Sequence, residues 1–184
     1  ANPDYVALMT FADVVDPPPL LDLTDWACKN ITFGPESPFQ GRYDPALFPY
    51  FREILVALGP DHPTREVVVC KSAQLGGTVV AQIFTAGALV DDPGPFLYVH
   101  PTEGNAVRWA KTKWKPMLRS VPALARLFNA EKSRDGGNSM LFMERRDGRG
   151  WLQVSGANSA ASLSMISVSR QVQDDLSKWE ANEA

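Results

Sequence analysis

Hydrophobic residues along this chain fall into short strand-like runs and longer segments with helical spacing. Runs of β-branched and aromatic residues indicate buried strands, and apolar residues three or four positions apart indicate helices. The pattern predicts strands at residues 67–70, 96–99, 139–143, 151–154 and 166–172. It predicts helices at residues 23–30, 45–58, 78–90, 102–114 and 122–128. The third and fourth strands are close enough to form a hairpin around residues 147–150.

Strands that alternate with helices are typical of an α/β domain with a mainly parallel sheet. We expect a three-layer fold with a ligand at the carboxyl ends of the strands. Residues 1–45 differ, because the proline run at 16–19 and the Gly/Pro-spaced stretch from 34 to 45 indicate an extended appendage with little core of its own. The sequence therefore predicts an appendage at 1–45 and a core domain at 46–184.

The segment between the first predicted strand and its helix has the composition of a phosphate-binding loop. Backbone amides of such a loop, with the dipole of the following helix, hold phosphate oxygens. Compared with G-x-x-x-x-G-K-[ST], Gly76 and Thr78 match, whereas Gly77 occupies the lysine position and Lys71 occupies that of the first glycine. We expect Lys71 to fold over the loop, and the Thr78 hydroxyl to bind Mg²⁺. The candidate phosphate-binding residues are Lys71, Ser72, Ala73, Gln74, Leu75, Gly76, Gly77 and Thr78. A strand-to-helix turn without a ligand is the alternative.

A pair of carboxylates follows the last predicted strand. In phosphate-loop ATPases a strand beside the loop delivers an aspartate to Mg²⁺. Asp174 suits that metal role, and Asp175 suits the orientation of the attacking water. The alternative is a solvated Asp-Asp pair that caps the next helix, since aspartate favours helix N-caps.

The predicted helix at 45–58 places Tyr50 and Arg52 on a different face from Phe51 and Leu55. Tyr50 could stack on a base and Arg52 could reach a phosphate or ribose, although Tyr50 could equally be an aromatic at the core edge. Thr102 is expected to be a helix N-cap. Trp109, Trp114 and Trp151 are expected to pack in the core.

Composition indicates a globular domain rather than a disordered one. The 184 residues are 45% hydrophobic and 21% charged, which is enough to form a core. Nothing approaches the roughly 20 apolar residues of a membrane span, no signal peptide is visible, and Cys28 and Cys70 lack the spacing of metal ligands. Cys70, at the end of the first predicted strand, is expected in the core.

The net charge of −3 hides a basic region between residues 103 and 149. It suits transient contact with a phosphate backbone, or it is a solvated helix face. Its basic residues are Arg108, Lys111, Lys113, Lys115, Arg119, Arg126, Lys132, Arg134, Arg145, Arg146 and Arg149.

Taken in order, these motifs resemble the large terminase subunit of tailed bacteriophages, in particular the lambda-type group. The resemblance covers nearly the whole chain, and the segments that carry it are residues 24–27, 49–55, 71–76, 99–102, 156–160 and 174–175. The chain departs from the family pattern at Phe51, where a glutamine is expected to read adenine. It also departs at Gly77, where many relatives keep a lysine, and at Asp175, where the family has glutamate.

The resemblance implies an ATP-hydrolysing motor domain with a phosphate-loop NTPase fold of the ASCE type, which moves double-stranded DNA into a procapsid. Its implied cofactors are ATP and Mg²⁺. Lys71 and Asp175 would be the catalytic residues, Thr78 and Asp174 the metal ligands, and Tyr50 and Arg52 the base-side contacts. An arginine finger is expected, with Arg52, Arg108 and Arg170 as candidates or one from a neighbouring subunit.

The resemblance also implies partners: the small terminase subunit at the N-terminal segment, the portal of the procapsid, and other copies of the chain in a ring. No membrane partner is implied, and the location would be the host cell cytoplasm. Because the chain stops just after the acidic strand, we expect a fragment or a naturally short version that lacks nuclease activity. A helicase-like remodelling ATPase and a non-catalytic binding module with this fold remain alternatives.

Overall fold

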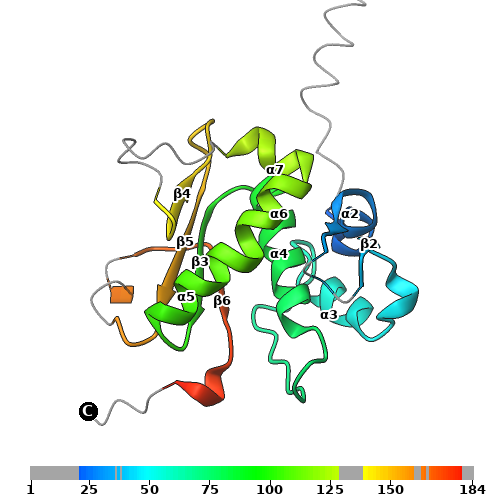
Figure 1. The fold of residues 1–184 in the computed structure, drawn as a ribbon, viewed down its shortest axis with the longest axis horizontal. Helices are drawn as coiled ribbons and strands as arrows, with labels where there is room; N and C mark the ends of the chain where they lie inside the picture. Colours follow the sequence, from blue (N-terminus) through cyan, green and yellow to red (C-terminus); the bar gives the residue numbers. More distant parts are fainter. Residues whose placement is uncertain are drawn as a thin grey trace, which may run out of the picture.

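The computed structural model describes residues 21–35, 37, 39–128, 139–159, 163–164 and 166–179 (Figure 1). The proline run at 16–19, Lys132, Arg134 and Ala160 lie outside these residues. In the described part of the chain, no helix is long and apolar enough to cross a membrane.

Four strands form a mixed sheet in the order β4-β5-β3-β6. The central strand β3 (Pro95–His100) runs parallel to β5 (Trp151–Gly156) and to β6 (Arg170–Gln173), whereas β4 (Phe142–Glu144) is antiparallel to β5. The predicted hairpin, the strand at 96–99 and a shorter form of the strand at 166–172 are thereby confirmed. Parallel pairing brings the carboxyl ends of β3, β5 and β6 to one edge of the sheet.

One face of this sheet carries the core. Phe96 and Tyr98 alternate with Leu97 and Val99, and in the register of β3 with β5 they lie beside Leu152 and Val154. Helices cover this face: α4 (Gly77–Asp91) brings Phe84 against Phe96, and α5 (Glu103–Trp109) brings Trp109 against Tyr98. A mainly parallel α/β arrangement is therefore present. The three-layer form remains a prediction.

The predicted helix at 102–114 continues further than expected. From α5 the chain enters a π-helical turn, η2 (Ala110–Trp114), and then α6 (Lys115–Ser120), before the short helix α7 (Pro122–Leu127). Thr102 caps α5 as predicted, because its Oγ1 accepts a hydrogen bond from the Asn105 amide at 3.2 Å. Trp109 and Trp114 are buried and stack on each other, which confirms their packing role. Trp151 is half-buried and contacts Phe142.

The helix α2 (Leu23–Asn30) has the predicted bounds, but the prediction of little core before residue 45 fails for it. Leu23, Trp26 and Ala27 are buried in the same hydrophobic core as α4, against which α2 packs. A small antiparallel pair, β1 (Thr32–Phe33) and β2 (Gly41–Arg42), follows it.

The helix predicted at 45–58 is broken into a 3-10 turn, η1 (Pro45–Leu47), and the helix α3 (Phe51–Ala57). Proline at position 49 removes a backbone donor, which accounts for an interruption there. Of the predicted apolar face, Phe48, Phe51 and Leu55 are buried, whereas Leu47 is exposed.

The strand predicted at 67–70 does not form. This segment has no regular secondary structure, and Val68, Val69 and Cys70 are exposed. An apolar run becomes a strand only when a sheet edge accepts its hydrogen bonds, and β6 pairs with β3 alone among the described strands. The prediction that Cys70 lies in the core is therefore wrong.

Candidate nucleotide site

The loop before α4 ends in a helix N-terminus without a side-chain cap. Gly76 is the N-cap residue with φ of 76°, and Gln74 is also left-handed, with φ of 65°. The amides of Val79 and Val80 already donate to the Gly76 carbonyl. An uncapped helix start of this kind favours an anion, because the first-turn amides and the helix dipole both point toward it. Ser72, Ala73, Gln74 and Leu75 are exposed, and Thr78 is half-buried.

Lys71 lies over the first residue of that helix. A Cβ built on Gly77 would lie 2.2 Å from Lys71 Cε and 3.4 Å from its Nζ. The side chain at the front of the loop thus covers the position at which the common motif has its lysine. This agrees with the prediction that Lys71 folds over the loop, and it explains why a residue without a side chain follows Gly76.

The start of α3 packs against the loop. A Cβ built on Gly76 would lie 2.7 Å from Phe51 Cζ, so the Phe51 ring packs directly against the loop. Phe51 is 1% exposed and stacks on Phe48, which makes it a core residue rather than a base-reading one. Tyr50 is half-exposed, and its hydroxyl donates to the Leu75 carbonyl at 3.3 Å. Tyr50 is therefore at the loop, and Arg52 is exposed in the first turn of α3.

The first carboxylate after β6 is held by the neighbouring strand. The Asp174 amide donates to the Val99 carbonyl at 2.9 Å, which continues the parallel ladder. The Tyr98 hydroxyl donates to Asp174 Oδ2 at 3.2 Å, and His100 Nδ1 lies 3.9 Å from the same oxygen. With its side chain 16% exposed, Asp174 is fixed at the carboxyl edge of the sheet.

The second carboxylate faces a different partner. Asp175 is left-handed, with φ of 50°, and its Oδ2 accepts a hydrogen bond from Lys178 Nζ at 2.6 Å. It precedes the 3-10 turn η3 (Leu176–Lys178), but its side chain caps no amide of that turn. The Trp179 indole donates to the Asp174 carbonyl at 2.9 Å. The capping alternative for the Asp-Asp pair therefore has no support from the side-chain contacts.

Electrostatics connect the loop with this acidic pair. The pKa of Asp175 is lowered, first by the hydrogen bond from Lys178 and further by the charges of Lys178, Lys71 and His100. Burial raises the pKa of Tyr98 well above its usual value, and the charge of Asp174 raises it further, so Tyr98 remains a donor. Burial lowers the pKa of His100, although Asp174 and Asp175 oppose that shift. Lys71 and Asp175 thus share one electrostatic environment.

The donor set fits a hard divalent cation. Asp174 offers a carboxylate oriented by Tyr98, and Thr78 offers a hydroxyl at the start of α4. Mg²⁺ binds through one or two protein oxygens together with phosphates and water rather than in an all-protein cage. The described residues contain no cluster of three His, Cys, Asp or Glu side chains that could hold a metal by themselves.

The arginine candidates differ in position. Arg170 is at the opposite end of β6 from Asp174, where its guanidinium pairs with the Asp92 carboxylate and donates to the Asp92 carbonyl at 3.0 Å. That contact removes it as an arginine finger for the site of its own chain. Arg52 and Arg108 are exposed.

Sequence reasoning missed three residues of the site: Tyr98, His100 and Lys178. Tyr98 and His100 are two positions apart on β3 and therefore lie on the same face of the sheet. The register that pairs Tyr98 with Val172 places His100 beside Asp174. Only the strand pairing reveals this, because β3 and β6 are far apart in the sequence. For Arg145 the prediction of a basic surface is wrong, because its side chain is 2% exposed and donates to the carbonyls of Leu89 and Val90 near the end of α4.

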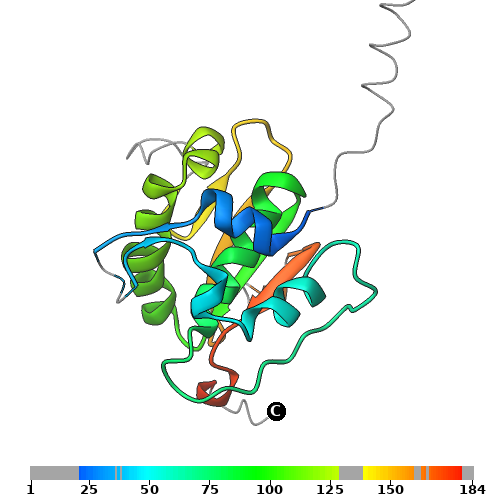
Figure 2. The ribbon, with the colours of Figure 1, turned by 90° about the vertical axis from the view of Figure 1, so that its right-hand side faces the viewer.

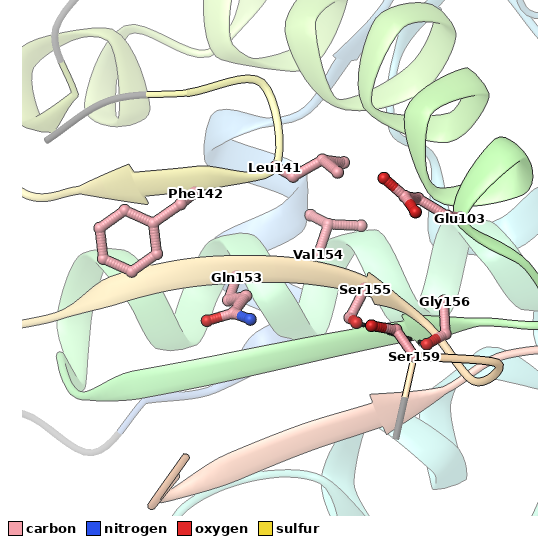
Figure 3. Close-up of a pocket in the computed structure, with 8 residues that line it drawn as sticks. All are labelled: Glu103, Leu141, Phe142, Gln153, Val154, Ser155, Gly156 and Ser159. Atoms are coloured by element: carbon pink, nitrogen blue, oxygen red, sulfur yellow. Dashed lines mark hydrogen bonds between the residues drawn. The ribbon is translucent and has the colours of Figure 1, made fainter. Parts of the chain in front are cut away.

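A shallow hollow of about 240 Å³ lies elsewhere, between the start of α5 and the β4–β5 hairpin (Figure 3). Glu103 reaches into it from α5, and Ser155, Gly156 and Ser159 line it from the end of β5. No residue of the loop at 71–78 takes part. The backbone is tight here, since a Cβ on Gly156 would lie 2.3 Å from the Glu103 nitrogen.

The sequence of the chain is similar to those of known proteins. The family model of the phage terminase large subunit gpA, ATPase domain, matches residues 37–184. The terminase large subunit of Escherichia phage lambda is 32% identical over 135 residues, which is 72% of this chain. The chain spans only 20% of the length of that relative. No solved structure matches.

Proposed function

Because the chain belongs to the phage terminase large subunit gpA family and matches its ATPase domain, we propose that it hydrolyses ATP to drive double-stranded DNA into a viral procapsid. The observation that carries the proposal is the position of Lys71 over the uncapped start of α4, in the same electrostatic environment as Asp175. A lysine, a helix N-terminus and a carboxylate pair are the parts that phosphoryl transfer requires.

In this proposal the phosphates of ATP lie on the loop. The backbone amides from Lys71 to Thr78 would donate hydrogen bonds to the phosphate oxygens, and the Lys71 ammonium would neutralise their charge. Thr78 and Asp174 hold Mg²⁺, which supplies charge neutralisation to the phosphates when it is bound. Tyr98 keeps one oxygen of Asp174 occupied by a hydrogen bond, which orients the carboxylate.

Asp175 would orient the attacking water. In the structure its carboxylate is occupied by Lys178, and both side chains are largely exposed, 39% for Asp175 and 66% for Lys178. An exposed ion pair of this kind contributes little stability, because water screens the two charges. The pair can therefore open readily, which would free Asp175 for the water. An arginine from a neighbouring subunit, or Arg52 or Arg108, would complete the charge stabilisation.

Tyr50 and Arg52 would contact the base side of the nucleotide. The hydrogen bond from Tyr50 to the Leu75 carbonyl supports this role, because it places a half-exposed ring beside the loop. Since Phe51 is in the core, its ring cannot take over adenine reading from the glutamine that the family has at this position. Base selection would then depend on Tyr50 stacking.

The partners follow from the family and are part of the proposal. They are double-stranded DNA, a small terminase subunit that binds within residues 1–45, the portal of the procapsid, and further copies of the chain in a ring. The motor would occupy residues 46–184 and act in the host cell cytoplasm. We expect no nuclease activity from these residues.

The test is Mg²⁺-dependent phosphate release from ATP, measured for the parent chain and for Lys71→Ala and Asp175→Asn. Arg65→Ala and Asp61→Asn are matched controls, because both positions are exposed in the segment before the loop. Turnover lost in the first two variants and kept in the controls supports the proposal. If the parent neither binds nor hydrolyses ATP, the non-catalytic binding module takes its place. The exposed valines before the loop are the observation that favours that module.

A further inference from the structure

The helical run from α5 to α7 carries an unusual charge pattern. From residue 108 to residue 127 the sequence contains no aspartate or glutamate, although acidic residues outnumber basic ones in the whole chain, 21 to 18. The basic residues of this run are Arg108, Lys111, Lys113, Lys115, Arg119 and Arg126.

The packing of the run divides its surface into two sides. Trp109, Ala110, Trp114 and Met117 are buried against the core. Figure 2 shows the run as a column of helices along one flank of the molecule. The exposed side chains of this column include the basic residues Arg108, Lys111, Lys113, Arg119 and Arg126. The buried side of the run therefore packs on the core, and its exposed side carries positive charge.

Elsewhere in the described part of the chain, some basic side chains form ion pairs, whereas Lys29, Arg42 and Arg65 form none. Arg145 and Arg149 pair with Asp147, Arg170 pairs with Asp92, and Lys178 pairs with Asp175. Arg108, Lys111, Lys113 and Arg126 also form no ion pair with any described carboxylate. Arg119 donates only to the Lys115 carbonyl, at 3.3 Å.

We propose that the outer surface of this run, defined by Lys111, Lys113, Arg119 and Arg126, binds the phosphate backbone of double-stranded DNA. This inference rests on the proposed function and names the surface of the motor that touches its DNA. From Lys111 to Arg119 the run rises about 12 Å at 1.5 Å per residue, which matches about three phosphates of one strand at about 3.4 Å of duplex axis each.

The chemistry of the surface favours DNA backbone over other polyanions. The exposed large hydrophobic residues of the chain all lie outside this run, so nothing in it would insert into a membrane. Lysine and arginine side chains supply the contacts to phosphate that do not depend on sequence. A motor that moves along DNA of any sequence needs contacts of this kind.

The inner side of the same run contacts the nucleotide site. Trp109 packs on Tyr98, with ring centroids 4.3 Å apart, and Tyr98 donates to Asp174. The DNA surface and the metal-binding carboxylate are thus joined through two buried rings. If DNA displaced the helical run, this contact would change the position of Tyr98 and, with it, of Asp174.

The experiment is fluorescence anisotropy of a short labelled DNA duplex with the full chain, at several salt concentrations. The test variant is the triple Lys111→Ala/Lys113→Ala/Arg119→Ala. The control is the triple Lys29→Ala/Arg42→Ala/Arg65→Ala, which removes the same charge from exposed positions on α2, β2 and the segment before the loop. If three phosphate contacts are lost, the salt slope falls by about 3 and the affinity at 0.1 M salt falls at least tenfold. The control should retain most of both.

Equal losses in the two triples would overturn the proposal, because net charge alone would then explain binding. A parent chain that binds vesicles of anionic lipid as tightly as duplex, with the same loss in the test triple, would also overturn it. Nucleotide binding, measured in parallel, separates the two levels. If the chain binds nucleotide but not DNA, only the proposed DNA-binding surface is contradicted. If it binds DNA but not nucleotide, the proposed function is contradicted.

Discussion

The side chain of Lys71 crosses the first residue of α4, so that a Cβ on Gly77 would lie 2.2 Å from Lys71 Cε. The lysine and the glycine therefore work as a pair. The charge that the common phosphate-loop motif carries inside the helix start is delivered here from the front of the loop. Gly77 has no side chain and leaves the space that the Lys71 side chain occupies.

Gly77→Ala should weaken nucleotide binding about tenfold without destabilising the chain. The new methyl displaces Lys71 from the helix start, whereas alanine is favoured over glycine inside a helix by up to about 1 kcal/mol. Binding of a fluorescent ATP analogue and the melting temperature report the two effects. Gly104→Ala is the control, because its Cβ would meet only Thr102 Oγ1, at 3.8 Å, near the start of α5. Equal affinities in the two variants would contradict the pairing of Lys71 with Gly77.

Gly76→Ala should destabilise the fold by about 2–5 kcal/mol. Part of this comes from the left-handed backbone, at about 1–2 kcal/mol, and part from overpacking against Phe51, at about 1–3 kcal/mol. Gly148→Ala separates the two, since Gly148 has φ of 68° and no atom within 4 Å of the added Cβ. In urea unfolding the Gly76 variant should lose more stability than the Gly148 variant. Equal losses would mean that Phe51 does not support the loop.

Tyr98→Phe should reduce the affinity for Mg²⁺-nucleotide while the fold remains intact. It removes the hydroxyl that orients Asp174, and hydrogen bonds to charged groups contribute about 1.5–3 kcal/mol. The readout is the Mg²⁺ concentration needed for half-maximal nucleotide binding, which should rise severalfold. Tyr43→Phe is the control: Tyr43 is also buried, and burial raises its pKa to about 12, but it lies in the layer of α2 and β2. The same Mg²⁺ shift in both variants would remove Tyr98 from its positioning role.

Asp147→Asn should flatten the acid limb of the stability curve. The hydrogen bond from Arg145 and those from Arg149 hold the pKa of Asp147 well below its usual range. A carboxyl whose folded-state pKa is depressed adds stability above its unfolded pKa near 4, and this stability is lost as the pH falls toward the folded value. Melting temperatures of the parent should therefore fall more steeply below pH 4 than those of the variant. Parallel curves would show that the pair does not contribute.

Local signals in the sequence predicted much of this fold. The bounds of α2, the start of α4, the cap of α5 and the β4–β5 hairpin follow from apolar spacing and turn residues, which act over a few positions. Lys71, Asp174 and Asp175 were proposed as site residues from the motifs around them, and their roles stay predictions. The valine run before the loop was not predicted correctly, because strand formation depends on a partner edge and not on propensity alone. Tyr98 and His100 were missed for the related reason that strand register brings them to Asp174.

Thermal melting with and without Mg²⁺-ATPγS tests the central claim most directly, namely that Lys71 is the phosphate-binding lysine of this site. At about 100 times the dissociation constant, a nucleotide that binds only the folded state stabilises it by about 2.7 kcal/mol, which corresponds to a shift of several degrees. The account predicts this shift in the parent and in Arg65→Ala, and its loss in Lys71→Ala. A shift that persists in Lys71→Ala, or no shift in the parent, would contradict it.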